Sequence, residues 1–153
     1  MLTKIKNELI YLSTLRRILS SLKSINKDES AIITKKIAGY ADSSPDSVAI
    51  YFEDKEITYR ELINGANQYS HWFLDNGLQK GDVVALLMEN RPEFLMAWIG
   101  IAQVGGTSAL INTNLTGHPL NHSLSISGAS KIILGKELIS NFETTDDTVK
   151  GSF

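Results

Sequence analysis

"VVALLMENRPEFLMAWIGIAQVGGTSALI", residues 83–111, contains two short apolar runs with a longer apolar run between them. The first short run, residues 83–88, is continuously apolar, which is typical of a strand that protein covers on both faces. The second, residues 107–111, follows a pair of glycines and predicts another strand. The stretch therefore predicts two strands, and the segment between them decides how they are connected.

That connecting segment has the signals of a helix. Asn90 stands where a cap residue would accept a backbone N–H, and Pro92 suits the first turn, where its missing N–H does no harm. Residues 94–104 are apolar nearly all round, which predicts a buried helix rather than an amphipathic one. Gly105 and Gly106 then end the helix.

The same alternation continues toward the C-terminus. Thr116 is in position to cap a helix that carries Leu120 and Leu124 and ends at Gly128. Residues 131–134 predict a third strand, after which KELISNF begins another helix. Strand, helix, strand, helix, strand with short links is the pattern of a parallel sheet with right-handed crossovers.

Residues before the sheet predict helices and a β-hairpin. A helix precedes a turn cluster of aspartates, serines and a proline at residues 42–47, and residues 48–52 and 56–58 are β-rich runs on either side of the turn EDK. Thr58 and Glu61 have the spacing of a capping box, so we expect a helix over residues 59–75. The predicted fold class is therefore α/β, with N-terminal helices and a β-hairpin leading into a partial parallel βαβαβ sheet.

The first 27 residues differ from the rest of the chain in charge. Six basic residues stand against Glu8 alone, a net +5, whereas the remainder is about −7 in a total of −2. Apolar side chains recur there at steps of three and four: Ile5, Leu9, Leu12, Leu15, Leu19, Leu22 and Ile25. Residues 1–27 therefore predict a basic amphipathic helix, which either lies on a membrane surface or packs on its own domain.

Composition excludes several classes of function. The 153 residues suffice for one domain with one sizeable core, and a net charge of −2 carries no nucleic-acid signature. The chain has no cysteine, which excludes a disulfide scaffold, a thiol nucleophile and cysteine metal sites. No apolar run reaches the roughly 18 residues of a spanning helix, and we expect no cleaved signal peptide. Trp72 and Trp98 fit core positions.

Two residue pairs suggest chemistry but have the wrong spacing for it. His118 and His122 lie four apart, but Pro119 between them and the lack of a nearby acidic residue argue against a metal site. Ser70 and His71 are neighbours on a predicted helix, so they point to different sides and do not form a nucleophile–base pair. The sequence also lacks a Rossmann glycine motif and a GxxxxGK[ST] phosphate loop.

Polar residues follow two of the predicted strands at the point where each strand ends. NTNLT (112–116) comes after the second strand and ENR (89–91) after the first. In open α/β sheets, ligands bind beyond the carboxyl ends of the strands, so both segments are candidate ligand sites. From the residues alone the simpler interpretation prevails, in which Asn112, Asn114 and Thr116 are turn and cap residues.

Three segments resemble the N-terminal region of adenylate-forming enzymes. They are ITYREL (57–62), GLQKGDVVALLMENRPEFLMAWIGIAQVGG (77–106) and ALINTNLTGHPLNHSLSISGASKIIL (109–134). TYREL would fit the whole superfamily, whereas ENRPEF followed by ALINTNL and ISGA is similar to the fatty acid transport protein and very-long-chain acyl-CoA synthetase branch. The resemblance covers nearly all of residues 30–140, and it implies that residues 28–153 are an incomplete N-terminal subdomain of an AMP-binding domain.

The resemblance implies a reaction and its cofactors. Members of that family use ATP and Mg²⁺ to convert a fatty acid into an acyl-adenylate, and they then transfer the acyl group to CoA. These 153 residues lack the family's Ser/Thr-Gly-Thr-Thr-Gly-x-Pro-Lys phosphate loop, its later nucleotide motifs, its magnesium carboxylate and its C-terminal lid with a lysine. We therefore expect an N-terminal fragment that is inactive alone, has no catalytic residue or metal ligand, and binds none of ATP, Mg²⁺ or CoA tightly.

The resemblance also points to residues with a role in the complete enzyme. In the wider family the loop after the strand that matches residues 107–111 borders the passage for CoA. By position, Thr113 and Asn114 are therefore the candidate cofactor-binding residues, and Asn112 and Thr116 support the loop. We expect a fatty acid substrate in the complete enzyme, no nucleic-acid partner and a cytoplasmic location, which is peripheral on the inner face of a membrane if residues 1–27 bind that membrane and do not pack on the protein. The alternatives are a non-catalytic membrane- or partner-binding module derived from that fold, and an unrelated nucleotide-binding α/β domain.

Overall fold

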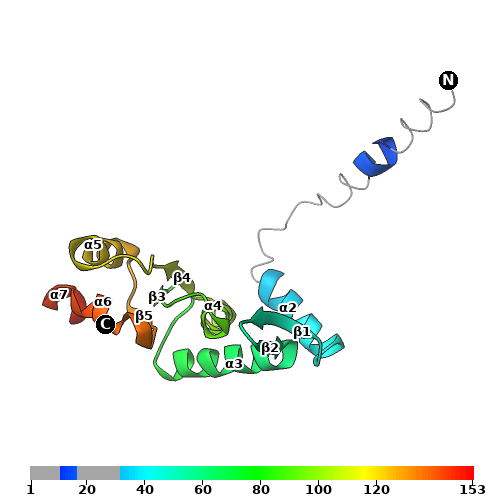
Figure 1. Cartoon of the computed structure of the whole chain (residues 1–153), viewed down its shortest axis with the longest axis horizontal. Coiled ribbons are helices and arrows are strands. Elements are labelled where there is room, and N and C mark those ends of the chain that lie inside the picture. The colour runs from blue at the N-terminus through cyan, green and yellow to red at the C-terminus, as the bar shows by residue number, and fades with distance from the viewer. Residues whose placement is uncertain (1–10, 17–31) are drawn as a thin grey trace. The chain divides into compact units, whose positions relative to one another are not determined.

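The computed structural model describes residues 11–16 and 32–153, and the second range carries the fold (Figure 1). Its α-helices are α2 (Ile32–Ser43), α3 (Tyr59–Asp75), α4 (Pro92–Gln103), α5 (Gly117–Ser127), α6 (Ile139–Glu143) and α7 (Asp147–Lys150). Its strands are β1 (Val48–Phe52), β2 (Lys55–Thr58), β3 (Val83–Leu87), β4 (Thr107–Leu110) and β5 (Lys131–Leu134), and a 3-10 turn, η1, covers Lys136–Leu138.

The three-stranded parallel sheet confirms the predicted βαβαβ pattern. β3 is the central strand, with β4 paired on one side and β5 on the other, and both pairings are parallel. Ala85 of β3 lies opposite Ala109 of β4 and Ile132 of β5. The order β4-β3-β5 therefore brings the carboxyl ends of all three strands to one edge, where loops from distant parts of the sequence meet.

Both faces of β3 are covered, which explains its uninterrupted apolar sequence. Ala85 and Leu87 pack in one core cluster with the apolar side chains of α5. Val84 and Leu86 lie on the opposite face, where they pack with side chains of α3 and α4. Successive side chains of a strand point to opposite faces, so a strand between two helical layers is apolar at every position. Figure 1 shows α4 and α5 on either side of the strands.

Helices α3 and α4 approach each other closely at Gly100. A Cβ atom on this residue would lie 2.7 Å from the Tyr69 Cβ and 2.8 Å from the Ala66 carbonyl oxygen, so any side chain there would force the helices apart. The Ser70 hydroxyl lies in the same contact, 3.0 Å from the Ala66 oxygen and 3.2 Å from the Gly100 oxygen. Ser70 therefore joins two helices, whereas the His71 side chain is exposed, so the two do not act as a pair.

The hairpin and the start of α3 are as the sequence predicts. β1 and β2 pair antiparallel, and α3 begins directly after Thr58. The Thr58 Oγ1 accepts a hydrogen bond from the Glu61 N–H at 3.2 Å, and the Glu61 carboxylate accepts one from the Thr58 N–H at 2.8 Å. The Thr58 hydroxyl also donates to the Glu61 carboxylate at 2.8 Å, and the two bonds that the carboxylate accepts, from the Thr58 N–H and from this hydroxyl, hold the pKa of the Glu61 carboxyl below its usual value. The capping box is therefore complete.

Two local expectations are wrong. The N-cap of α4 is Arg91 and not Asn90, because Pro92 fixes the first helical position and the residue before a proline is held extended, here at φ −152° and ψ 169°. Trp72, which the sequence placed in the core, is 47% exposed. It lies beside the buried stripe of α3 and not on it, since the core position is taken by its neighbour Phe73. Trp98, in contrast, packs against the core as expected.

Residues 11–16, the described part of the predicted N-terminal helix, are helical. Within them Tyr11, Leu12 and Leu15 are 66%, 57% and 38% exposed. The remainder of the predicted helix over residues 1–27 lies outside the described residues. Among the helices that the structure describes, none is both long enough and apolar enough to cross a membrane.

Candidate functional site at the carboxyl edge of the sheet

The carboxyl edge of the sheet collects one loop from each of its strands. The loop after β4 begins at Ile111, whose N–H donates to the Leu86 carbonyl of the central strand at 3.1 Å. The loop after β5 begins at Gly135, whose N–H donates to the Leu87 carbonyl at 2.8 Å. Both outer loops therefore start against the end of β3, which is the arrangement that the strand order predicts for a ligand site.

The loop after β4 is a turn that Asn112 stabilises. Its Oδ1 accepts a hydrogen bond from the Asn114 N–H at 2.9 Å, and its carbonyl oxygen accepts one from the Leu115 N–H at 3.2 Å. Asn112 and Asn114 are exposed, and Thr113 is half-buried. Thr116 is the N-cap of α5, as predicted, but its side chain makes no capping hydrogen bond. Asn112 therefore shapes the loop, while the Asn114 amide faces solvent.

Asn141 of α6 holds this loop from outside, and Thr144 at the end of α6 holds the start of α5; neither residue was predicted from the sequence. Asn141 donates through Nδ2 to the Thr113 carbonyl at 3.1 Å and lies 3.4 Å from the Leu115 carbonyl. The Thr144 hydroxyl accepts a hydrogen bond from the Gly117 N–H at 2.6 Å. The backbone of the loop and the start of α5 are thus tied to a segment that follows the third strand.

An ion pair joins the loops after β3 and β5. The Glu137 carboxylate accepts a hydrogen bond from the Glu89 N–H at 3.0 Å and lies 3.1 Å from the Arg91 guanidinium. Hydrogen bonds from its own N–H and from that of Glu89 hold the pKa of the Glu137 carboxyl below its usual value, and Arg91 lowers it further. The ENR segment is therefore tied to the loop after β5, and Arg91 contributes a positive charge that is already paired.

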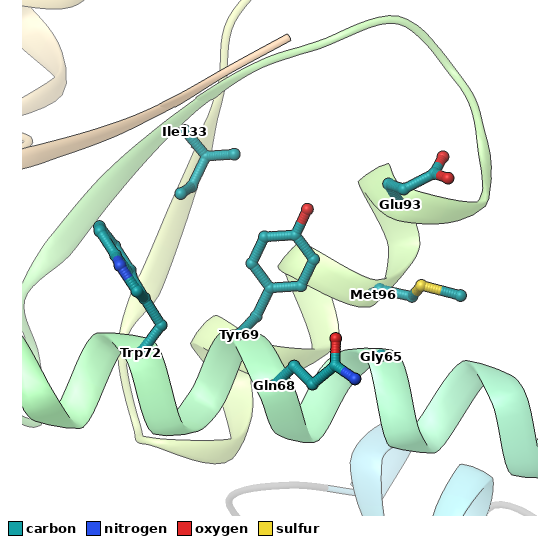
Figure 2. Close-up of a pocket in the computed structure, with 7 residues that line it drawn as sticks. All are labelled: Gly65, Gln68, Tyr69, Trp72, Glu93, Met96 and Ile133. Atoms are coloured by element: carbon teal, nitrogen blue, oxygen red, sulfur yellow. The ribbon is translucent and has the colours of Figure 1, made fainter.

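A mainly apolar groove of about 410 Å³ lies between α3, α4 and β5 (Figure 2), and none of the residues that line it is a predicted site residue. It is lined by Gly65, Gln68, Tyr69, Trp72, Glu93, Met96 and Ile133. Figure 2 shows the Tyr69 side chain rising from α3 between Trp72 and Met96. Burial, and secondly the nearby Glu93 carboxylate, raise the pKa of the Tyr69 hydroxyl, so this group stays protonated at neutral pH.

The groups at the carboxyl edge suit binding more than bond chemistry. Loop amides and a hydroxyl can hydrogen-bond a polar ligand, and the Arg91 guanidinium is already paired with the carboxylates of Glu93 and Glu137. Among the residues that the structure describes, no three His, Asp or Glu side chains are grouped so that they could hold a metal ion. His118 and His122 are exposed on α5.

Comparison with known proteins finds relatives over most of the chain. The profile of the AMP-binding enzyme family matches residues 38–151. Long-chain fatty acid transport protein 6 of Homo sapiens is 31% identical over 128 residues, which are 82% of this chain and 21% of that protein. Long-chain fatty acid transport protein 1 of Rattus norvegicus is 33% identical over 135 residues, again 21% of its length. The chain therefore spans about a fifth of the length of these relatives.

A solved structure shows the same fold. The inhibitor-bound N-terminal domain of FACL13 from Mycobacterium tuberculosis superposes with a TM-score of 0.67 at 26% sequence identity. The superposition covers 78% of this chain and 34% of that one. The mixed α/β fold with its parallel three-stranded sheet, predicted from the sequence, is thus confirmed by the structure and by this likeness.

Proposed function

The chain belongs to the AMP-binding enzyme family, and we propose that it is the N-terminal part of a long-chain fatty acyl-CoA synthetase. The complete protein would use ATP and Mg²⁺ to adenylate a fatty acid and would then transfer the acyl group to CoA. The observation that carries this proposal is the 31% and 33% identity to long-chain fatty acid transport proteins over 82% and 87% of the chain.

Adenylation solves a specific chemical problem for a fatty acid. A carboxylate is a poor electrophile, and attachment of AMP gives it a good leaving group that the CoA thiol can displace. We assign none of the bond-breaking groups to these residues. Their part is to build the scaffold, a buried central strand whose carboxyl edge aligns three loops. We accordingly propose that residues 1–153 alone form no acyl-CoA and bind none of ATP, Mg²⁺ and CoA tightly.

Within that scaffold, Thr113 and Asn114 are proposed to border the passage for CoA. Their support is local. They lie in a loop at the carboxyl edge of the sheet, the Asn114 side chain is exposed, and the loop carries no charge. An uncharged loop with an exposed asparagine amide suits the amide-containing arm of CoA, which needs hydrogen bonds along its length and no ion pairs.

Residues 1–27 are proposed to attach the protein to the inner face of a membrane, from which the enzyme would take its substrate. The support is the exposure of Tyr11, Leu12 and Leu15 in the described helical segment, beside Arg16. Apolar side chains that enter the acyl boundary, next to basic ones that reach the headgroups, are the features of an interfacial helix.

The direct test is product formation. The full-length protein that carries this segment is incubated with oleate, ATP, Mg²⁺ and CoA, and oleoyl-CoA is quantified by mass spectrometry. We expect product from the full-length protein and none from residues 1–153 above a no-protein control. A full-length protein that makes no acyl-CoA yet binds lipid vesicles would replace the enzyme with the non-catalytic membrane-binding module.

A further inference from the structure

One side chain from outside the loop after β4 hydrogen-bonds to the backbone of residues 112–115, among the residues that the structure describes. That side chain belongs to Asn141. Its Nδ2 group lies 3.1 Å from the Thr113 carbonyl and 3.4 Å from the Leu115 carbonyl, so one amide spans the turn. The two contacted carbonyls flank Asn114 on either side.

The body of the protein holds Asn141 in place. Its neighbour Phe142 packs against the core cluster that contains Leu87 of the central strand. The Asn141 carbonyl accepts a hydrogen bond from the Thr144 hydroxyl at 2.6 Å, and that same hydroxyl accepts the N–H of Gly117 at the start of α5. Asn141 itself is half-buried. A donor fixed by packing restrains its acceptors, so the conformation of the loop depends on α6.

Other contacts fix the two ends of the loop: the Ile111 N–H donates to the Leu86 carbonyl, and Ile111 and Leu115 pack against the core cluster that contains Leu87. The internal bonds of the loop, from Asn114 and Leu115 to Asn112, shape the turn but do not attach it to its surroundings. Between these ends the side chains of Asn112 and Asn114 are exposed and do not anchor the turn. Without the Asn141 amide the turn would sample more orientations, and a ligand would have to select one of them.

We propose that Asn141 is a positioning residue, which holds the loop of Thr113 and Asn114 in the orientation that accepts CoA. This role rests on the proposed function of that loop. Asn141 does not touch the substrate or the cofactor; it acts through the backbone of Thr113 and Leu115. It belongs to the second half of the reaction, in which CoA takes the acyl group, and not to adenylation.

The test separates the two half-reactions in the full-length protein. Asn141→Ala removes the amide, and Asn141→Asp keeps its size but removes the donor. We expect both variants to raise the KM for CoA roughly five- to tenfold, the effect of one or two lost hydrogen bonds, with kcat and fatty-acid-dependent ATP–pyrophosphate exchange unchanged. Asn76→Ala is the matched control, because it removes an exposed asparagine amide that donates to the Trp72 carbonyl at 2.8 Å, far from this loop in the sequence.

The remaining outcomes distinguish this inference from the function on which it rests. An Asn141→Ala protein with wild-type pyrophosphate exchange and an unchanged KM for CoA overturns the inference and leaves the proposed function standing. Equal losses in both half-reactions also overturn it, since Asn141 would then be needed only for folding. A wild-type protein without pyrophosphate exchange removes the proposed function, and the inference with it.

Discussion

Glu137 has a role at the carboxyl edge that its position in the sequence indicates. It follows β5 by three positions and joins two loops at the carboxyl edge through the Glu89 N–H and the Arg91 guanidinium. Applying the strand-end rule to the third predicted strand, as to the first two, would have selected it. Asn141 carried no such signal, because its partners are backbone carbonyls of a loop 26 and 28 residues away.

The charge of Glu137 gives a pH-dependent prediction. Its folded pKa is lowered, so its stabilisation is present above the pKa of the unfolded chain and is lost as the pH falls through the folded pKa. Glu137→Gln should therefore lower the free energy of unfolding at pH 7 by about 0.5–1 kcal/mol, since the side chain is partly exposed.

The measurement is urea unfolding of the chain, followed by tryptophan fluorescence at low protein concentration. The difference between wild type and Glu137→Gln should shrink once the pH is well below the usual glutamate pKa. A difference of the same size at pH 7 and in acid would show that the charge of Glu137 is not the source of the effect.

At the scale of elements, the sequence predicted the strand that is covered on both faces and the helix ends that local residues determine. Three local signals each indicate one structure, and all three are present. They are the uninterrupted apolar run of β3, the capping box of α3 and the left-handed glycine at the end of α5. The element bounds differ where neighbouring signals compete. Pro92 overrides Asn90 as the start signal of α4, and KELISNF divides into η1 and α6.

Alanine substitutions at Gly100 and Gly39 should change the free energy of unfolding in opposite directions, because only Gly100 lies in a close contact between helices. Gly100→Ala should destabilise the chain by about 1–3 kcal/mol, because the new methyl group would meet the Ala66 carbonyl, which belongs to the backbone of α3 and cannot turn away. Gly39→Ala in α2 should stabilise it by about 0.5–1 kcal/mol, because nothing lies within 4 Å of a Cβ atom there. Chemical denaturation of both variants decides this, and equal effects would refute the packing account of α3 and α4.

The N-terminal segment is tested on vesicles. A peptide of residues 1–27 should co-sediment with anionic vesicles at low salt, since each basic residue near such a surface contributes about 1 kcal/mol. Leu12→Glu should abolish this binding, because it places a charge among the exposed apolar side chains of residues 11–16. Added salt should weaken the binding of the unsubstituted peptide to the vesicles. A peptide that stays in the supernatant at low salt would mean that the helix packs on protein.

At the scale of the whole molecule, the structure describes a scaffold with apolar surface still exposed. The groove beside Tyr69 and the half-exposed Trp72 lie on one side of the sheet. Leu110 and Ile126 are 58% and 70% exposed elsewhere. The sequence predicted the fold class of this scaffold because periodicity and turn residues are local. It did not predict the groove, because residues of α3, α4 and β5 form it together. Nor did it predict the contacts of α6, because they join residues that are far apart in the sequence.

The central claim is that these residues belong to an enzyme that adenylates long-chain fatty acids. The most direct test is ATP–pyrophosphate exchange by the full-length protein, because exchange reports formation of the acyl-adenylate without any need for CoA. We expect exchange that depends on Mg²⁺ and on oleate, with little when acetate or an amino acid replaces it. Exchange with an amino acid and none with oleate, or no exchange with any carboxylate, would contradict the claim.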